Sequence, residues 1–144
     1  MTHPDPLAAA ADRLPSGLFL MTAAHDTRAG AIIRWAQRCA EEPVLVAVAL
    51  PKGHTIAPVI RDSRAFGLCE VRPDDKLLLA KFSKPEPPDE QEDPFASLRV
   101  RTLKTGAPLL AGSTLALDCE VVRHFDLEAD HEIYIGQVVA ALGG

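Results

Sequence analysis

The chain has 144 residues, of which 47% are hydrophobic and 24% are charged. This composition is typical of one globular domain and excludes a collagen-like, coiled-coil or wholly disordered chain. The 15 Lys and Arg residues against 20 Asp and Glu residues give a net charge of −5. That balance argues against nucleic-acid binding, which depends on clustered basic side chains.

The sequence pattern predicts neither a membrane span nor export. The longest uninterrupted apolar run, 44–50, is far shorter than the roughly 20 residues that cross a bilayer. The N-terminal residues have no basic start, and Asp5 and Asp12 flank their alanine cluster. Three widely spaced cysteines in apolar surroundings indicate reduced core thiols rather than a disulfide framework: Cys39, Cys69 and Cys119. We therefore expect a cytoplasmic protein.

Most of the predicted elements are strands. In chain order, the expected strands are 18–21, 29–36, 44–50, 66–71, 113–124 and 131–140. The clearest is 44–50, because a short, valine-rich apolar run between Pro43 and Pro51 is typical of a buried strand.

Two short helices are expected between these strands. Thr55 is a plausible N-cap for a helix over 55–63, whose apolar residues recur at helical spacing. Asp74 is expected to cap the second helix, in which Leu78 and Phe82 share one face.

The domain organisation is simple. We expect one domain over 1–144, with an alanine-rich N-terminal segment, 1–12, that is helical. Residues 84–94 read KPEPPDEQEDP, and this acidic, proline-rich text predicts an exposed loop. The part of the chain that follows it is too short for a second domain of this kind.

The sequence pattern in the last third of the chain predicts an antiparallel hairpin. In 113–124, apolar residues alternate with Asp118 and Glu120, which we expect to face water, and 131–140 has the same character beyond an acidic turn. Six or seven strands with short turns and two short helices indicate a mainly β fold, a β-barrel with short peripheral helices.

The histidines do not form a recognised catalytic or metal-binding pattern. His124 and His131 are separated by an acidic turn, but no third ligand stands at a familiar spacing, so no metal is expected. No serine or cysteine pattern identifies a nucleophile, and no dinucleotide or phosphate-loop motif is present.

The segment before the buried run has two interpretations. Arg34, Trp35, Gln37 and Arg38 follow one another closely there. The tryptophan can be a core residue beside two solvated arginines. Equally, an amphipathic ring, an amide and fixed positive charge are what a flat, phosphate-bearing ligand requires. Composition alone leaves both open.

Nine short motifs follow one another along residues 13–141 in a characteristic order. They are LPSG at 14–17, the segment 30–43 with Trp35 inside it, PVLVAV at 43–48, KGHT at 52–55 leading to Ile60, SRAF at 63–66, DPF at 93–95, GAPLL at 106–110, LDCEVV at 117–122 and DHEIYIGQV at 130–138. Their order and spacing resemble the flavin reductase-like family, whose fold is the FMN-binding split barrel.

The resemblance implies a function. Members of this family commonly form homodimers with the flavin in a groove at the interface. NAD(P)H gives hydride to FMN, and the electrons pass to oxygen, a partner oxygenase or another acceptor. His131 matches the histidine of the family's Gly-Asp-His turn near the flavin ring, so it is the expected catalytic residue, with a positional or polar role.

The resemblance and the basic aromatic segment together give a set of expected cofactor-binding residues. They are Ile32, Ile33, Arg34, Trp35, Gln37, Arg38, Ala40, Lys52 and Thr55. Among them, Lys52 and Thr55 match the lysine and threonine of the family loop that approaches the flavin phosphate, where a lysine supplies a point charge.

Several positions depart from the family pattern. Ile32, Arg34 and Ala40 stand where the family often has hydroxyl residues, and Cys69 stands where it often has asparagine. Each lost hydrogen bond is worth roughly 0.5 to 1.5 kcal/mol, so three losses weaken FMN binding by about one to three powers of ten. An alternative function therefore stays open, a split-barrel binding or interaction module with weakened or lost flavin binding.

Overall fold

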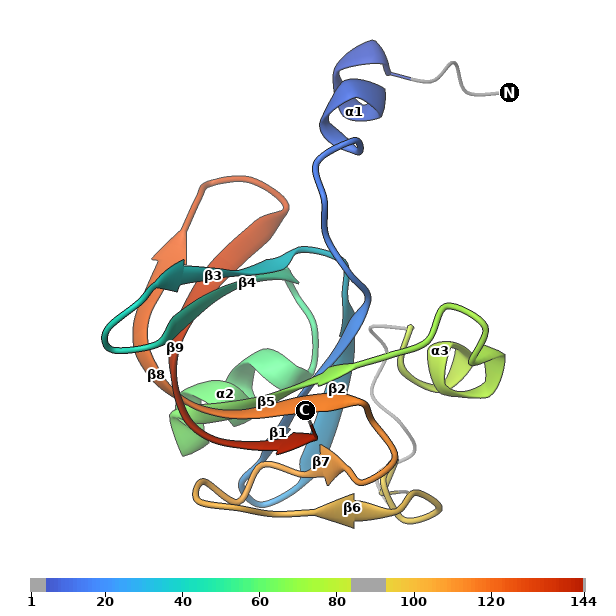
Figure 1. The fold of residues 1–144 in the computed structure, drawn as a ribbon, viewed down its shortest axis with the longest axis vertical. Helices are drawn as coiled ribbons and strands as arrows, with labels where there is room; N and C mark the ends of the chain where they lie inside the picture. Colours follow the sequence, from blue (N-terminus) through green and yellow to red (C-terminus); the bar gives the residue numbers. More distant parts are fainter. Residues whose placement is uncertain (1–4, 84–92, 144) are drawn as a thin grey trace.

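The computed structural model describes residues 5–83 and 93–143 and has a mainly β architecture (Figure 1). The main strands are β1 (Phe19–Ala24), β2 (Arg28–Ile33), β3 (Ala36–Ala40), β4 (Leu45–Pro51), β5 (Ala65–Glu70), β8 (Leu115–Asp126) and β9 (His131–Gly143). They form one antiparallel seven-stranded sheet in the order β2-β1-β5-β8-β9-β4-β3, which curves around the core. The predicted mainly β, split-barrel class is confirmed.

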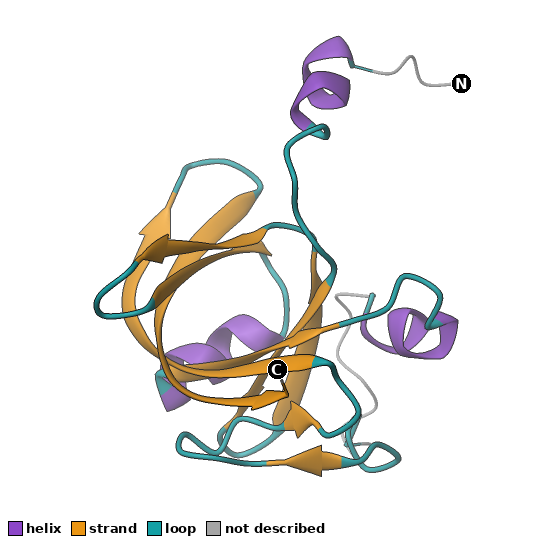
Figure 2. Cartoon of the chain, in the orientation of Figure 1, coloured by secondary structure: helices purple, strands orange, loops and turns teal. Residues whose placement is uncertain are grey.

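The two edges of the sheet are neighbours in the chain. β2 and β3 are the edge strands, and no ladder joins them in the described part of the chain. A short ribbon of β6 (Val100–Arg101) and β7 (Leu109–Leu110) lies beside the barrel (Figure 2). The open seam therefore lies where the chain passes from β2 to β3.

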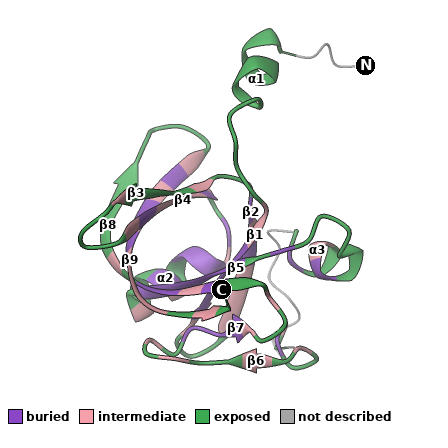
Figure 3. Cartoon of the chain, viewed as in Figure 1, coloured by how far each residue is buried: buried purple, intermediate pink, exposed green. Residues whose placement is uncertain are grey.

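In the part of the chain that the structure describes, three helices accompany the sheet. The predicted helix over 55–63 is confirmed as α2 (Ile56–Ser63), which buries Ile56, Ala57 and Ile60 against β1, β2 and β5. α1 (Pro6–Ala11) has no buried residue and projects away from the barrel (Figure 3). Within residues 5–83 and 93–143, no helix has the length and apolar character that a membrane crossing needs.

The third helix, α3 (Lys76–Phe82), buries Leu78 and Phe82 as expected, but its predicted cap is wrong by one residue. The side chain of Asp75 accepts the hydrogen bond from the Leu78 N–H (3.2 Å). Asp74 instead forms an ion pair with Arg72 (2.8 Å). Asp75 is the N-cap because the helix begins at Lys76, one residue later than Asp74 as a cap requires.

Two apolar clusters form the core. The first fills the barrel and includes Phe66, Tyr134 and the inward side chains of β4. The second lies between the outer face of β1 and β5 and the elements that cover it, with Leu20, Phe82 and Phe95 among its members. β5 is buried on both faces because these two clusters lie on either side of it.

The predicted strand 29–36 is wrong in its extent. β2 ends at Ile33 and the chain bends at Arg34 and Trp35 before β3 begins. The Ser16 hydroxyl donates to the Arg34 carbonyl (2.6 Å), and the Ala49 N–H donates to the Trp35 carbonyl (3.0 Å). These bonds to distant segments satisfy the backbone at the bend, so the chain can leave β2, which pairs with β1, and enter β3, which pairs with β4.

The expectation that Asp118 faces water is also wrong, since this side chain is 0% exposed. Its carboxylate accepts hydrogen bonds from the backbone N–H groups of Lys104 (2.7 Å) and Thr105 (3.0 Å), and also from the Thr105 hydroxyl. The loop after β6 thus covers this face of β8. A buried carboxylate is tolerated here because three donors replace its water shell.

The cysteine prediction holds for two of three residues. Cys69 and Cys119 are buried free thiols, and burial raises their pKa values to about 11 and about 12. Cys39 is exposed, so its placement in the core was wrong, because β3 is an edge strand with an uncovered face.

The predicted loop 84–94 falls mostly outside the described residues. Only Asp93 and Pro94 of that loop belong to the part that the structure describes. Asp93 is exposed but forms an ion pair with Arg28 of β2, whose hydrogen bond lowers the pKa of the Asp93 carboxyl.

We expect the buried His54 to make the folded state less stable in mild acid. It is 7% exposed at the start of α2, its Nδ1 accepts the Ile56 N–H (3.3 Å), and burial lowers its pKa below the ordinary 6.5. The unfolded state therefore binds more protons than the folded state in mild acid, and the free energy of unfolding falls as pH decreases through about 6.5. Urea unfolding at about pH 7.5 and about pH 5.5 measures this loss. His54→Asn keeps an acceptor that does not titrate, so it loses less stability over the same interval; an equal loss contradicts the assignment.

We expect a substitution of the buried Thr22 to stabilise the fold. Its hydroxyl is fully buried and has no hydrogen-bond partner among the described residues. Thr22→Val replaces this hydroxyl with a methyl group of similar size and removes the desolvation cost, so we expect the free energy of unfolding to rise by roughly 1 kcal/mol. Urea unfolding measures the change. Thr22→Ser keeps the hydroxyl and is the control without this gain. A loss of stability in the valine variant would show that the hydroxyl has a partner.

Candidate functional site

The register of β4 and β9 determines where the candidate site lies. Pro51, the last residue of β4, is paired with His131, the first residue of β9. Lys52 follows directly, and its backbone N–H donates to the Asp130 carbonyl (3.0 Å). Two residues far apart in the sequence, Lys52 and His131, therefore lie at the same end of the sheet.

Trp35 joins this end of the sheet from the bend between β2 and β3. Its carbonyl is bonded to Ala49, which places the residue beside β4. The indole and the His131 imidazole have ring centroids 5.0 Å apart and are tilted by 53°. Trp35 is 47% exposed, so core packing does not explain its presence.

A pocket of about 330 Å³ lies beside Trp35, on the outer face of the sheet. The chain between α1 and β1 forms one wall, and β3, β4 and β9 form the floor. The lining residues are Ala11, Asp12, Leu14, Pro15, Ser16, Trp35, Ala36, Gln37, Ala47, Ala49 and Ile133. Its size and largely apolar lining with a few polar groups are typical of a small-molecule site.

Alternation along β4 creates the floor of this pocket. Val46, Val48 and Leu50 are buried inside the barrel, so Ala47 and Ala49 face outward. The small alanine side chains leave space above the sheet. Gln37 pairs with Ala47 in the neighbouring strand and adds an amide to the lining.

Lys52 and His131, at this end of the sheet, each lie against a carboxylate. Lys52 Nζ lies 2.5 Å from Asp126 Oδ1, and this hydrogen bond is the main reason why the pKa of the Asp126 carboxyl is low. His131 Nδ1 lies 2.9 Å from Asp130 Oδ1, which likewise lowers the pKa of Asp130. Because a carboxylate only accepts, Nδ1 carries the proton and Nε2 is the remaining polar atom of the ring.

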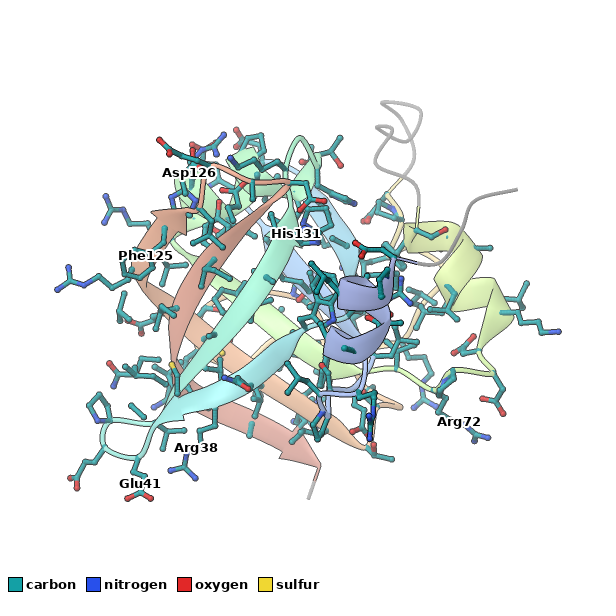
Figure 4. All side chains as sticks on the ribbon, turned by 90° about the horizontal axis from the view of Figure 1, so that it is seen from above. Arg38, Glu41, Arg72, Phe125, Asp126 and His131 are labelled. Atoms are coloured by element: carbon teal, nitrogen blue, oxygen red, sulfur yellow. The ribbon has the colours of Figure 1, made fainter. Side chains whose placement is uncertain are left out.

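Arg38 lies at the other end of β3 and β4. Figure 4 shows Arg38 and Glu41 at the opposite end of the strands from His131 and Asp126. Arg38 pairs with Val46, five positions before Pro51, a distance of about 17 Å along a strand. Its guanidinium donates to the carbonyls of Ala40 (3.1 Å) and Glu41 (3.2 Å). The structure therefore does not bring Arg38 and Ala40 together with Lys52.

The other expected cofactor residues are also separated. Ile33 is buried in the barrel core, and Ile32 packs against the second cluster on the opposite face of β2. Arg34 is exposed at the bend. Thr55 occupies the predicted N-cap position of α2, but its side chain makes no capping hydrogen bond. Thr55 is half-buried and belongs to the same loop as Lys52.

His124 and His131 do not converge. His124 Nε2 lies 2.5 Å from Glu132 Oε1, which also accepts the Tyr134 hydroxyl (3.2 Å). Burial is the main cause that raises the pKa of Tyr134 to about 12. The described residues contain no group of three or more side chains suited to a metal ion.

Sequence reasoning missed two features of this site. The alternation in 44–50 could have identified Ala47 and Ala49 as outward-facing, because the larger residues between them require the inner face. Nothing in the sequence predicted that Asp126 binds Lys52. That contact depends on how the end of β8 meets the loop after β4.

Comparison with known proteins gives a family. Residues 11–143 match the family model described as the flavin reductase like domain. Diflavin flavoprotein A 1 of Synechocystis sp. is 28% identical over 134 residues, which are 92% of this chain and 23% of that protein. The ferric-chelate reductase (NAD(P)H) of Archaeoglobus fulgidus is 24% identical over 132 residues, which are 90% of this chain and 76% of that protein.

Structural comparison shows the same fold in a solved protein. The NADH:FAD oxidoreductase SgcE6 of Streptomyces globisporus superposes with a TM-score of 0.84 at 21% identity, covering 100% of this chain and 88% of that one. The chain spans less than a quarter of the diflavin relatives that it matches. The family match extends from the end of α1 to the end of β9 and confirms the resemblance seen in the sequence, so the chain belongs to the flavin reductase-like domain family.

Proposed function

We propose that this chain binds FMN and acts as a flavin reductase, taking hydride from NAD(P)H and passing the electrons to an acceptor. The observation that carries the proposal is the grouping of Trp35, His131 and Lys52 beside an outward-facing pocket in a protein of this family. An aromatic ring, an oriented imidazole and a cation are three different groups that a flavin nucleotide engages.

The residues present fit a flavin. Trp35 and the alanines of β4 offer an apolar surface for a flat ring, and Gln37 offers an amide to a polar edge. Lys52, with Thr55 in the same loop and Arg34 at the bend, offers charge and a hydroxyl to a phosphate. A bound flavin would supply the hydride-accepting chemistry, while the protein supplies binding and orientation.

His131 acts as a positioning residue. Its Nδ1–H is held by Asp130, and its ring contacts the indole of Trp35, so two groups fix the imidazole. Hydride transfer needs no general base, and the chemistry does not require the ring to gain or lose a proton. We assign to it the orientation of the bound rings, which lowers the entropic barrier.

A homodimer would complete the site. Four outer-face side chains of β4 and β9 are only half-buried in the single chain, namely Ala47, Ala49, Ile133 and Ile135. Phe125 continues the face and is exposed, and α1 has no buried residue at all. A contiguous apolar face of this kind marks an interaction surface. A second copy covering it would shield the pocket from water.

Known relatives support redox chemistry and leave the acceptor open. One is named a ferric-chelate reductase (NAD(P)H), and another is an NADH:FAD oxidoreductase. We propose an oxygenase or another redox protein as the acceptor, and FAD is to be tested beside FMN. The free thiols of Cys69 and Cys119 fit a reducing compartment, and we place the protein in the cytoplasm.

A second candidate function rests on one observation. Lys52 is bonded to Asp126, and Arg38 is bonded to backbone carbonyls, so both cations already have partners in the chain. This arrangement favours weak binding of a phosphorylated flavin. If flavin binding is lost altogether, the barrel serves as a binding module without flavin chemistry.

The absorption spectrum of the purified protein separates the two functions. For a flavin reductase we expect visible flavin bands, directly or after addition of FMN or FAD, and oxidation of NADH or NADPH that depends on the flavin. A protein that takes up neither flavin and leaves both nicotinamides unoxidised contradicts the reductase and favours the binding module.

The single tryptophan allows the position of the flavin to be tested. Trp35 is the only tryptophan of the chain, so its fluorescence reports on this site alone. We expect titration with FMN to quench this fluorescence. Trp35→Ala should raise the FMN dissociation constant by about three- to tenfold through lost aromatic contact, and Trp35→Phe should lose less. Binding seen by absorbance without quenching would place the flavin elsewhere.

A further inference from the structure

The cation best placed to bind a flavin phosphate is already paired with an acid of the same chain. Lys52 Nζ lies 2.5 Å from Asp126 Oδ1. The two residues come from different segments, the loop after β4 and the end of β8. A backbone hydrogen bond from the Lys52 N–H to the Asp130 carbonyl (3.0 Å) ties the loop after β4 to the turn that follows β8. The amine is therefore held against the acidic turn.

Asp126 is oriented toward Lys52 by a second donor. The Glu128 N–H donates to the same oxygen, Asp126 Oδ1 (2.8 Å), and Glu128 has a positive φ of 55° that closes the turn. The Lys52 charge also lowers the pKa of the Asp130 carboxyl, but among the described residues neither Asp130 nor Glu128 forms a direct ion pair with the Lys52 amine. Asp130 is bonded to His131, and no ion pair of Glu128 is found among the described residues.

We propose that Asp126 is a built-in competitor for the phosphate group that Lys52 binds, and that it sets how strongly this protein prefers a phosphorylated flavin over an unphosphorylated one. The inference rests on the proposed function. Its ligand is the phosphomonoester of FMN, and its mechanism is exchange of one anion for another on the same ammonium group.

The exposure of the pair makes such an exchange feasible. The side chain of Lys52 is 34% exposed and that of Asp126 is 63% exposed. An ion pair in contact with solvent is only weakly stabilising, so a phosphate with a charge of about −1.5 to −2 can displace the carboxylate. FMN therefore meets a competitor for the Lys52 ammonium group, whereas riboflavin, which has no phosphate, does not.

The test compares FMN with riboflavin, which lacks the phosphate. Both are titrated into the wild type, Asp126→Asn and the control Glu128→Gln, with binding followed by flavin fluorescence or absorbance. Asn keeps an oxygen that accepts the Glu128 N–H, so the turn is retained. We expect Asp126→Asn to lower the FMN dissociation constant by about two- to fivefold and to leave riboflavin unchanged. Glu128→Gln removes an equal charge from the same turn and should change either constant by less than about twofold.

A double variant tests the role of Lys52. If Asp126 acts through the lysine, Asp126→Asn gives no gain for FMN in a Lys52→Gln background. Asp126→Ser is a second neutral variant, and circular dichroism confirms that each variant is folded.

The possible outcomes are distinct. If riboflavin and FMN both bind but Asp126→Asn and Asp126→Ser leave the FMN constant unchanged, the inference is wrong and the proposed function stands. An equal gain for riboflavin, or a gain that persists without Lys52, also overturns it. If neither flavin binds to the wild type or to any variant, the proposed function fails and the inference fails with it.

Discussion

The pairing of β4 with β9 is the constraint on which the candidate site depends. Alternate residues of these strands fill the barrel, and the others form the floor of the pocket. A slip of one residue would turn Ala47 and Ala49 inward and expose Val48 and Leu50, at the cost of the core. Burial of the large side chains therefore fixes the position of the small ones. The same register places His131 opposite Pro51 and beside Lys52, so core packing and site geometry have one cause.

Local patterns predicted the elements whose structure depends on local chemistry. The apolar run 44–50, the helix over 55–63 and the final hairpin were recognised because periodicity and turn residues define them. The bend at Arg34 and Trp35 was missed, because bonds from Ser16 and Ala49 create it. Asp118 was wrongly expected to face water for a similar reason. The three groups that donate hydrogen bonds to its carboxylate come from a loop that the strand pattern does not reveal.

The site was predictable in part. The family resemblance singled out Trp35, Lys52 and His131, and the structure brings these three to one end of the sheet. The resemblance and composition could not show which charges neutralise one another. Lys52 and Arg38 were counted as two cations for one ligand, but they lie at opposite ends of β4 and each already has partners. Electrostatics at this surface is a property of the folded chain, because charges are paired by tertiary contacts.

The outer edge of β3 has a consequence for how the molecule behaves in concentrated solution. An edge strand with a regular backbone can recruit a strand from another molecule and start an open-ended polymer. In β3 the register shifts between Arg38 and Ala40, and the Arg38 guanidinium covers the carbonyls of Ala40 and Glu41. The irregular backbone and the local charges make this edge a poor template for strand addition. An arginine that first suggested ligand binding thus helps to keep the barrel from aggregating.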